Sequence, residues 1–260
     1  MKAWEWEKLD PVQRLGVTIA GVALQEHTKQ SKLLYRLERP AINLSGAKLS
    51  QVDLSEASLA GGRLDRADLR KVRLEGAHLQ GCSLWKANLS WVEATGADLR
   101  LCNLDGADLT EAVLVQARLT SATARNAILM RAEASGAQLE GAKLQDALLE
   151  SIDLEGATLR IAELQSAALP LANLRGADLS GANLEDADLR GADLSGARLD
   201  GARLQGARFS ASDTDEKGVP LKSILSERVA APVPTAALLL SARWETIVVD
   251  GRPVSRGDLR

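Results

Sequence analysis

The stretch from Gly176 to Asp200 is GADLSGANLEDADLRGADLSGARLD, which contains five copies of one five-residue unit. Each unit has Leu at its centre, a small residue two positions earlier and a polar residue between them. The same spacing continues without an insertion from Leu44 to Phe209, through 34 consecutive units. Thirty of the central residues are Leu, one is Phe and three are Ala. A fixed period over this length indicates a repeat architecture.

The period of five is incompatible with one continuous helix or strand, whose side-chain periods are about 3.6 and about 2 residues. The small, polar and Leu residues of each unit suit a short extended segment in which the first and third side chains point inward. The two remaining residues must then turn the chain. Of the 21 glycines, 15 lie two residues after a centre, where a corner needs freedom in φ. The pattern therefore predicts an all-β solenoid with short sides.

The unit Ala177-Asp178-Leu179-Ser180-Gly181 resembles the consensus of the pentapeptide-repeat family, and the resemblance covers Ala41 to about Ser210. It implies a right-handed quadrilateral β-helix with four repeats per coil. On that basis the 34 repeats make about 8.5 coils. At about 4.8 Å per layer, the rod would be roughly 40 Å long.

Several inward positions depart from the consensus. The Ala centres Ala94, Ala124 and Ala134 are expected to leave the core under-filled and to distort the middle of the rod. Cys82 and Cys102 are 20 residues apart, so four repeats per coil would stack them inward on adjacent coils. We interpret them as small core residues that replace Ala, with a redox pair or a metal site as the alternative.

The two ends of the chain leave the repeat pattern. Residues 1–40 predict a helical N-terminal cap, in which Asp10 is the N-cap and Pro11 the first helical residue. The alternative is a membrane-surface helix, which the weakly basic polar face disfavours. Residues 211–260 predict an irregular C-terminal extension with a short helix, a Pro-containing linker and a hairpin around Asp250-Gly251. We expect the hairpin to pad the last coil or to pair with another subunit.

The composition favours a soluble cytoplasmic protein. The formal net charge is −3, without the basic excess that direct nucleic-acid binding requires. We find no signal-peptide pattern, no apolar run long enough for a membrane span, and too few cysteines for a disulfide scaffold. His27 and His78 form no zinc-binding pair, and phosphate-loop and nucleophile motifs are missing. We therefore predict no enzyme activity, no metal and no cofactor.

One side of the expected rod carries nearly all of its net charge when the sequence is sampled every 20 residues. Eight carboxylates face only Arg73 and Arg175 there, a sum of −6, whereas the other three sides sum to 0, +1 and 0. Glu56 lies at a corner of this side. The candidate acidic partner-binding face consists of Asp53, Glu75, Glu93, Glu133, Asp153, Glu155 and Asp193.

A second side has apolar residues at outward positions, which typically marks an interface. Three explanations stay open: the chain's own termini cover this surface, a second copy or another protein binds it, or it has no function. Ala168 belongs to the same surface, and Trp91 lies on the same side about two coils earlier. The candidate apolar interface patch consists of Ile128, Met130, Leu148, Pro170 and Leu171.

These features together predict a non-catalytic protein–protein interaction module or scaffold, with a protein partner and no membrane association. A homodimer through the apolar side is one form of this interaction. The family resemblance implies a sharper alternative, because some pentapeptide-repeat proteins mimic B-form DNA, bind DNA gyrase or other type II topoisomerases, and protect gyrase from quinolones or toxins. The acidic side suits such mimicry, whereas the modest charge excess weakens it.

Overall fold

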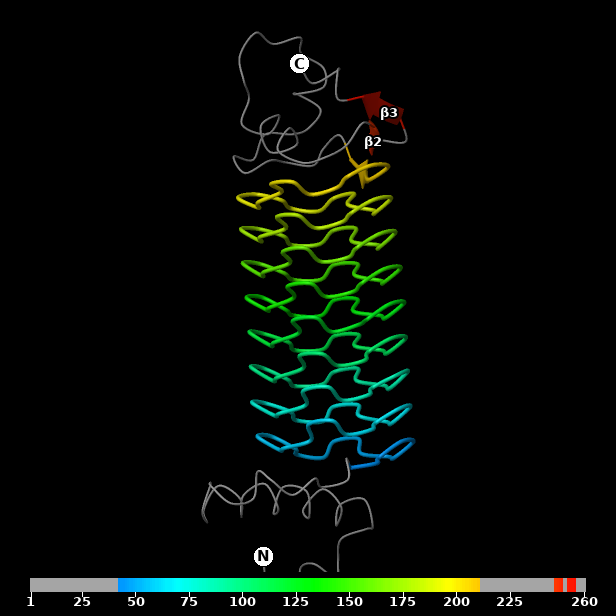
Figure 1. Ribbon diagram of the computed structural model, residues 1–260, viewed down its shortest axis with the longest axis vertical. Helices are drawn as coiled ribbons and strands as arrows, with labels where there is room; N and C mark the ends of the chain where they lie inside the picture. Colours follow the sequence, from blue (N-terminus) through cyan, green and yellow to red (C-terminus); the bar gives the residue numbers. More distant parts are fainter. Residues whose placement is uncertain (1–41, 211–245, 250–251, 256–260) are drawn as a thin grey trace, which may run out of the picture.

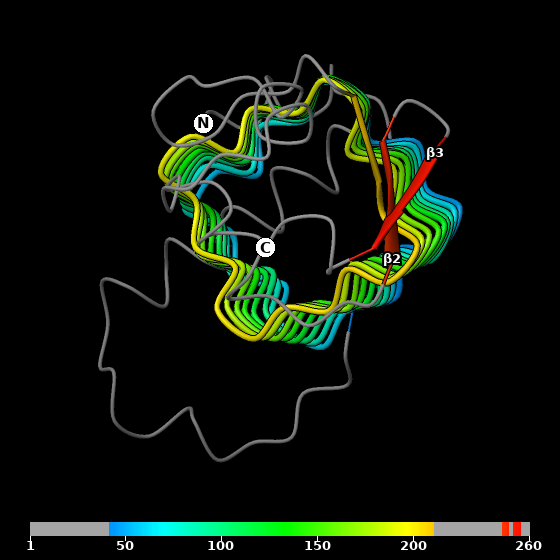
Figure 2. The same ribbon diagram turned by 90° about the horizontal axis from the view of Figure 1, so that it is seen from above.

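The computed structural model describes residues 42–210, 246–249 and 252–255. The predicted N-terminal cap, and the predicted short helix and linker of the C-terminal extension, lie outside these residues. The repeats form a rod of stacked coils (Figure 1). Viewed along the rod, successive coils nearly superpose, so that each side of one coil lies above the same side of the coil before it (Figure 2).

Each coil contains 20 residues. Parallel bridges join each polar residue before a centre to the residue 20 positions later, from Asn43↔Arg63 to Asp188↔Arg208. Because 20 residues hold four repeats, the bridges confirm four repeats per coil. The rod is therefore a β-helix solenoid whose sides are too short to form long strands; its last side ends in strand β1 (Arg208–Phe209).

Backbone hydrogen bonds connect each coil to the next. The N–H of each centre donates to a carbonyl of the following coil, as Leu44 does to Arg63 at 2.7 Å, and so does the corner N–H of Gly46, to Asp65 at 2.8 Å. Within each repeat a third bond closes the turn, as Ala47 N–H donates to the carbonyl of Leu44 at 3.0 Å. Each coil therefore depends on its neighbours for most of its stability.

The core is a set of stacked Leu layers. The Leu centres from Leu44 to Leu204 and the final centre, Phe209, are buried, and so are most of the small residues two positions before them. Ile42 is exposed, and Val52 is only partly buried. Burial of one Leu side chain contributes about 1.5–3 kcal/mol, so the repeated Leu layers are the main source of stability.

The corners impose one backbone conformation on every repeat. All 33 residues two positions after a centre, from residue 46 to residue 206, have positive φ, between 50° at Ile161 and 74° at Gly191. Fifteen of them are Gly, as the sequence suggested, but 18 are other residues. A left-handed conformation costs such residues roughly 1–2 kcal/mol each. The bonds and packing of the coil must offset this cost, so the turn dictates the conformation regardless of the side chain.

The Asp or Asn residue before many centres caps the turn. In 13 repeats its Oδ1 accepts a hydrogen bond from the backbone N–H two residues later, as Asp53 does from Ser55 at 3.0 Å. Side chains of this length commonly make such bonds in turns. The consensus polar residue therefore has a structural role, which charge counting alone does not reveal.

A hairpin adds one further layer at the C-terminal end of the rod. It consists of β2 (Thr246–Val249) and β3 (Arg252–Ser255), which pair antiparallel at the place where the sequence predicts a hairpin. β2 pairs parallel with β1, and the N–H of Gly206 donates to the carbonyl of Thr246 at 2.8 Å. Ile247 is fully buried. The hairpin thus pads the last coil (Figure 1).

The Ala centres do not distort the rod. Parallel bridges continue unbroken through residues 93–153, so the expectation of mid-rod distortion is wrong. The missing side-chain volume instead leaves an apolar cavity of about 10 Å³ beside Ala134, lined otherwise by Leu and Ile side chains. Ala94 and Ala124 do not line this cavity. Under-filling is therefore confirmed only at Ala134, and the space is too small and too apolar to attract more than one water.

We expect Ala134→Leu to raise the free energy of unfolding by about 1–2 kcal/mol, because the new side chain restores the Leu stack and fills the cavity. The same change at Ala124, Ala124→Leu, should give no gain, because no cavity is present to receive the side chain. Urea unfolding followed by circular dichroism measures both. A loss of stability in Ala134→Leu would show that the surrounding Leu residues have already closed the space.

Candidate interaction surfaces

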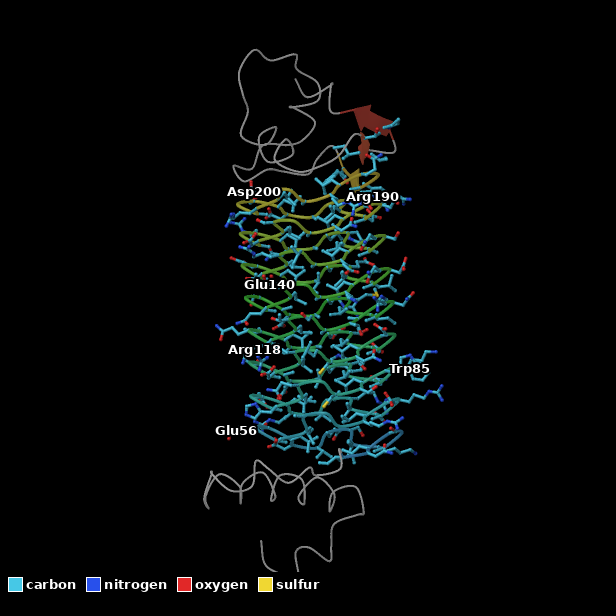
Figure 3. All side chains as sticks on the ribbon, viewed as in Figure 1. Glu56, Trp85, Arg118, Glu140, Arg190 and Asp200 are labelled. Atoms are coloured by element: carbon cyan, nitrogen blue, oxygen red, sulfur yellow. The ribbon has the colours of Figure 1, made fainter. Side chains whose placement is uncertain are left out.

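The outward side chains form columns along the rod, because residues 20 positions apart lie on successive coils. Figure 3 shows these side chains along the rod, with Trp85 on one flank and Glu56, Arg118 and Glu140 on the opposite one. We call the side centred on residues 54, 74 and so on to 194 the acidic face. We call the side centred on residues 49, 69 and so on to 209 the apolar face.

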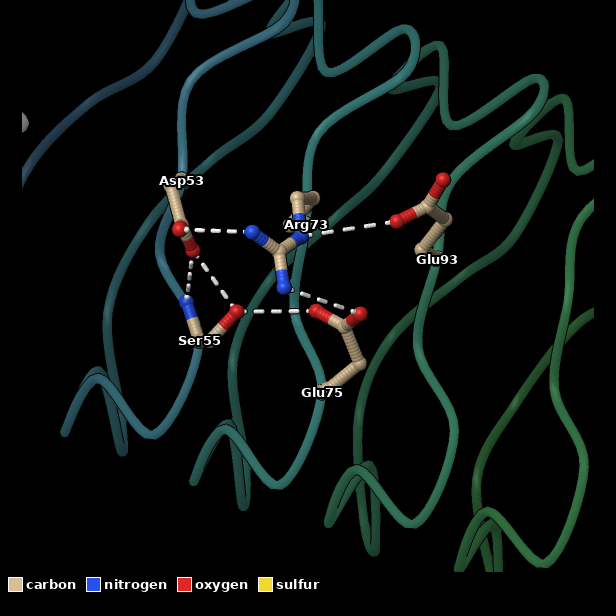
Figure 4. A network of polar contacts seen from close by, with 5 residues as sticks. All are labelled: Asp53, Ser55, Arg73, Glu75 and Glu93. Carbon is tan, nitrogen blue, oxygen red and sulfur yellow. Dashed lines mark hydrogen bonds and ion pairs between the residues drawn. The ribbon is translucent and has the colours of Figure 1, made fainter.

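The N-terminal part of the acidic face is neutralised by one arginine. Arg73 forms ion pairs with Asp53 at 3.0 Å, Glu75 at 3.4 Å and Glu93 at 3.5 Å (Figure 4). The Ser55 hydroxyl donates to Asp53 at 2.6 Å and contacts Glu75 at 2.8 Å. Hydrogen bonds from Ser55, aided by the charge of Arg73, lower the pKa of Asp53. Three of the candidate acidic residues are therefore tied into one network.

The remaining negative charge lies further along the acidic face. Glu133 and Asp153 are neighbours on adjacent coils, and Asn173 donates to Asp153 at 2.8 Å and to Glu155 at 3.3 Å. Asp193, by contrast, pairs with Arg175 at 3.2 Å. Among the residues that the structure describes, Glu133, Asp153 and Glu155 form no ion pair with a cation. The summed charge of the face thus reduces to a short uncompensated row, which a simple charge count missed.

The structure brings the candidate apolar residues together on three successive coils. Ile128 pairs with Leu148, and Leu148 with Ala168, through parallel bridges. Leu148 is 43% exposed and Leu171 is 62% exposed. These residues, with Met130 and Pro170, constitute the apolar patch, namely Ile128, Met130, Leu148, Ala168, Pro170 and Leu171.

The exposed Leu171 side chain rests against the backbone of the next coil. A Cβ atom at Gly191 would lie only 2.7 Å from Leu171 Cδ2, so no larger residue fits at Gly191 while Leu171 keeps this position. Glu150 lies between Met130 and Pro170 along the patch, and Arg131 borders it. The patch is therefore an apolar surface with a polar margin, which is the usual make-up of a protein interface.

Sequence reasoning missed a polar cluster around Asp98, a side chain that is nearly buried. Its carboxylate accepts hydrogen bonds from Arg100 Nε at 2.8 Å, from Gln80, and from Arg118 at 3.3 Å. Burial alone would raise the pKa of Asp98, but the hydrogen bonds from Arg100 and Gln80 outweigh burial and lower the pKa to about 2. The cluster joins three coils of one side, so its role is to stabilise the rod.

The two cysteines lie in the core as expected. Cys82 and Cys102 are buried, and their thiols donate to the carbonyls of Leu59 and Leu79 at 2.9 Å each. The hydrogen bond with Cys82, together with burial, raises the pKa of Cys102. Both contacts are those of small core residues. Within the described residues, no group of three or more His, Cys, Asp and Glu side chains is placed to hold a metal ion.

The solenoid agrees with the comparison to known families. A family model described as pentapeptide repeats matches residues 41–76, 73–110, 107–146, 137–176 and 172–210, with 8 copies. The chain belongs to the pentapeptide-repeat family. The matched residues coincide with the coils of the rod, and this family forms β-helix solenoids. In the described part of this pentapeptide-repeat protein, no helix has the length and apolar character needed to cross a membrane.

Several solved pentapeptide-repeat structures are similar to this chain. HetL from the cyanobacterium Nostoc sp. strain PCC 7120, involved in regulating heterocyst differentiation, is 28% identical, with 89% of this chain and 98% of HetL covered and a TM-score of 0.39. QnrB1, a plasmid-mediated fluoroquinolone resistance protein, is 24% identical, with coverage of 57% and 70% and a TM-score of 0.24. Rfr23 from the cyanobacterium Cyanothece 51142 is 27% identical, with coverage of 48% and 85% and a TM-score of 0.16. No curated protein sequence matches the chain.

The Asp98 cluster predicts a specific loss of stability in acid. The pKa of Asp98 falls from its ordinary 3.8 in the unfolded chain to about 2 in the rod, so its contribution is present above about pH 4 and disappears as the pH falls through about 2. Asp98→Asn should lower the free energy of unfolding by about 1–3 kcal/mol at pH 7 and should flatten this part of the pH profile. Urea titrations at pH 7, 4 and 2.5 measure the effect. Asp200→Asn, an exposed carboxylate on the same side, is the control and should keep the wild-type profile.

Proposed function

We propose that this pentapeptide-repeat protein is a non-catalytic interaction module that binds a partner protein through the apolar patch. The observation that carries the proposal is the gathering of apolar side chains from three successive coils on one face, with Leu148 and Leu171 largely exposed. Isolated exposed apolar residues are common on protein surfaces, but a contiguous group is typical of an interface. The polar residues Arg131 and Glu150 supply the margin.

The rigidity of the rod supports this function. The apolar patch lies on sides whose backbone hydrogen bonds are complete on both neighbouring coils, as at Leu149, Ser151 and Asp153. Such a surface loses little conformational freedom on binding, and a preorganised surface converts more of its contact energy into affinity. The described core, in contrast, offers only a small apolar cavity. The outward surface is therefore the part of the molecule suited to recognition.

Charged substitutions in the apolar patch should abolish partner binding. Leu148→Glu and Leu171→Glu together place two carboxylates at the centre of the interface, and we expect at least a tenfold loss of partner recovery because central apolar contacts often contribute about 2 kcal/mol or more. Affinity capture with quantitative mass spectrometry measures recovery of other proteins. Sedimentation velocity of the purified protein measures pairing with a second copy.

The matched control is the pair Leu101→Glu and Ile161→Glu. Both residues are as exposed as Leu171 and also lie at positive-φ corners, but they are three coils apart on another side of the rod. This control should keep wild-type binding and wild-type thermal stability. Equal losses in both double variants would mean that recovery depends on general surface hydrophobicity, and the proposal would then be wrong.

A second candidate function is mimicry of DNA toward gyrase or another type II topoisomerase. The uncompensated row of Glu133, Asp153 and Glu155 on the acidic face supports it, because closely spaced negative charges are what a DNA-binding surface recognises. The pairing of Asp53, Glu75 and Glu93 with Arg73 restricts the candidate mimicry surface to this row.

Under this second candidate, micromolar protein should alter gyrase supercoiling or its inhibition by a quinolone. Glu133→Gln, Asp153→Asn and Glu155→Gln together should remove the effect, because they delete three charges while Asn at position 153 retains the turn cap. Glu140→Gln, Glu163→Gln and Asp200→Asn delete the same charge on other sides and should leave the effect unchanged. A wild-type protein without any effect on gyrase would contradict DNA mimicry.

A further inference from the structure

Two tryptophans frame one side of a single coil. The segment Trp85-Lys86-Ala87-Asn88-Leu89-Ser90-Trp91 places one indole at each end of that side. The Trp85 ring has Arg66 at 4.7 Å and Lys86 at 4.8 Å from its centroid, and the Trp91 ring has Lys71 at 5.6 Å. Trp91 is 45% exposed. Three cations are thus held against two aromatic rings on the N-terminal part of the apolar face and its edge.

Nearby carboxylates are already engaged by other partners. Asp68 pairs with Arg70 at 2.7 Å, and Glu111 accepts hydrogen bonds from Arg131 at 2.7 Å and from the Trp91 indole at 2.8 Å. Within the described residues, no ion pair joins a carboxylate to any of the three ring-bound cations. Their positive charges are therefore attracted to rings and left without neutralisation by anions.

The floor between the two indoles also offers donors. Asn88 Oδ1 accepts hydrogen bonds from the backbone N–H of Ser90 at 3.1 Å and from its hydroxyl at 2.5 Å. These bonds occupy the oxygen of the Asn88 amide and leave its NH₂ group to face outward. Ser90 itself is buried. The surface between the tryptophans is consequently low, flanked by rings, and rich in hydrogen-bond donors.

We propose that this surface binds an acidic peptide segment of a partner protein. We call it the Trp–cation surface, and it consists of Arg66, Lys71, Trp85, Lys86, Asn88 and Trp91. A cation stacked on an indole still directs its N–H groups outward, so it can donate to a carboxylate while the ring holds it in place. The combination of Trp with Arg or Lys is also the composition that dominates binding energy at protein interfaces.

A single-stranded nucleic acid is a poorer match to the same surface. Sequence-tolerant binding of single strands depends on bases that stack on aromatic faces, and here Arg66, Lys71 and Lys86 occupy ring faces. Carboxylates need only the cations' outward N–H groups, and they leave the stacked arrangement intact.

The inference goes beyond the proposed role of the apolar patch and can fail independently of it. The Trp91–Glu111–Arg131 contacts run along one corner from the Trp–cation surface to the margin of the apolar patch. A partner with an acidic segment next to an apolar surface would therefore contact both along one face.

Fluorescence anisotropy of a fluorescein-labelled deca-glutamate peptide against the full chain tests the proposal. We expect saturable binding at about 50 mM salt that weakens toward 300 mM, since screening shortens the range of charge interactions. Arg66→Gln, Lys71→Gln and Lys86→Gln together should weaken binding at least tenfold. Trp91→Leu should weaken it about threefold or more, although it removes no charge.

The control variant removes the same charge elsewhere through Arg160→Gln, Arg198→Gln and Arg203→Gln, and it should change the affinity by less than about twofold. A labelled ten-nucleotide oligothymidine should bind more weakly than the peptide. Absence of peptide binding, equal losses in both triple variants, or tighter binding of the oligothymidine would each overturn the proposal. Leu148→Glu with Leu171→Glu should leave peptide binding unchanged, which separates this result from the test of the apolar patch.

Discussion

The left-handed corner is the constraint on which the rest of the molecule depends. Every fifth residue from 46 to 206 has positive φ, and the chain turns there whether that residue is Gly, Trp or Ile. The turn would be costly for most residues in isolation. Interior Leu packing and hydrogen bonds between coils offset the cost, so corner and core stabilise each other. A single repeat could not hold this conformation alone, which is why the fold requires an uninterrupted series.

This regular coil converts sequence periodicity into surface columns. Residues 20 positions apart become neighbours on one side, so Arg73 contacts carboxylates of the coils before and after its own. The same register assembles the apolar patch from segments that are distant in sequence. Because the outward residues contribute little to the core, they are free to differ from side to side. The surface can therefore carry recognition without any change to the fold.

Several outward residues nevertheless serve the fold as well as the surface. Asp153 contributes negative charge to the acidic face, and its Oδ1 also caps the turn at Glu155. Asp98 is almost entirely structural, because its carboxylate is consumed by neighbouring donors. A count of charges treats these residues alike. The hydrogen bonds show which charges are available to a partner and which belong to the rod.

The sequence alone determined the solenoid, the inward Leu and Ala positions, the stacking of Cys82 on Cys102 and the place of the C-terminal hairpin. These features follow from spacing, because a fixed period leaves few ways to bury the Leu residues. It also located the apolar patch, although the 20-residue step that assembles it came from the family resemblance and was confirmed by the bridges. The function of that patch stays a prediction.

Only the tertiary structure decided which charges are paired, where the core is under-filled and which side chains stack on the tryptophans. Arg73 could have pointed away from its three carboxylates, and the spacing is identical at Ala124 and Ala134 although only Ala134 borders a cavity. Likewise, nothing in the local sequence of Trp91 places Lys71 over its ring. These outcomes depend on side-chain rotamers and on contacts between coils. The repeat period fixes where each side chain begins, but three-dimensional packing decides where it ends.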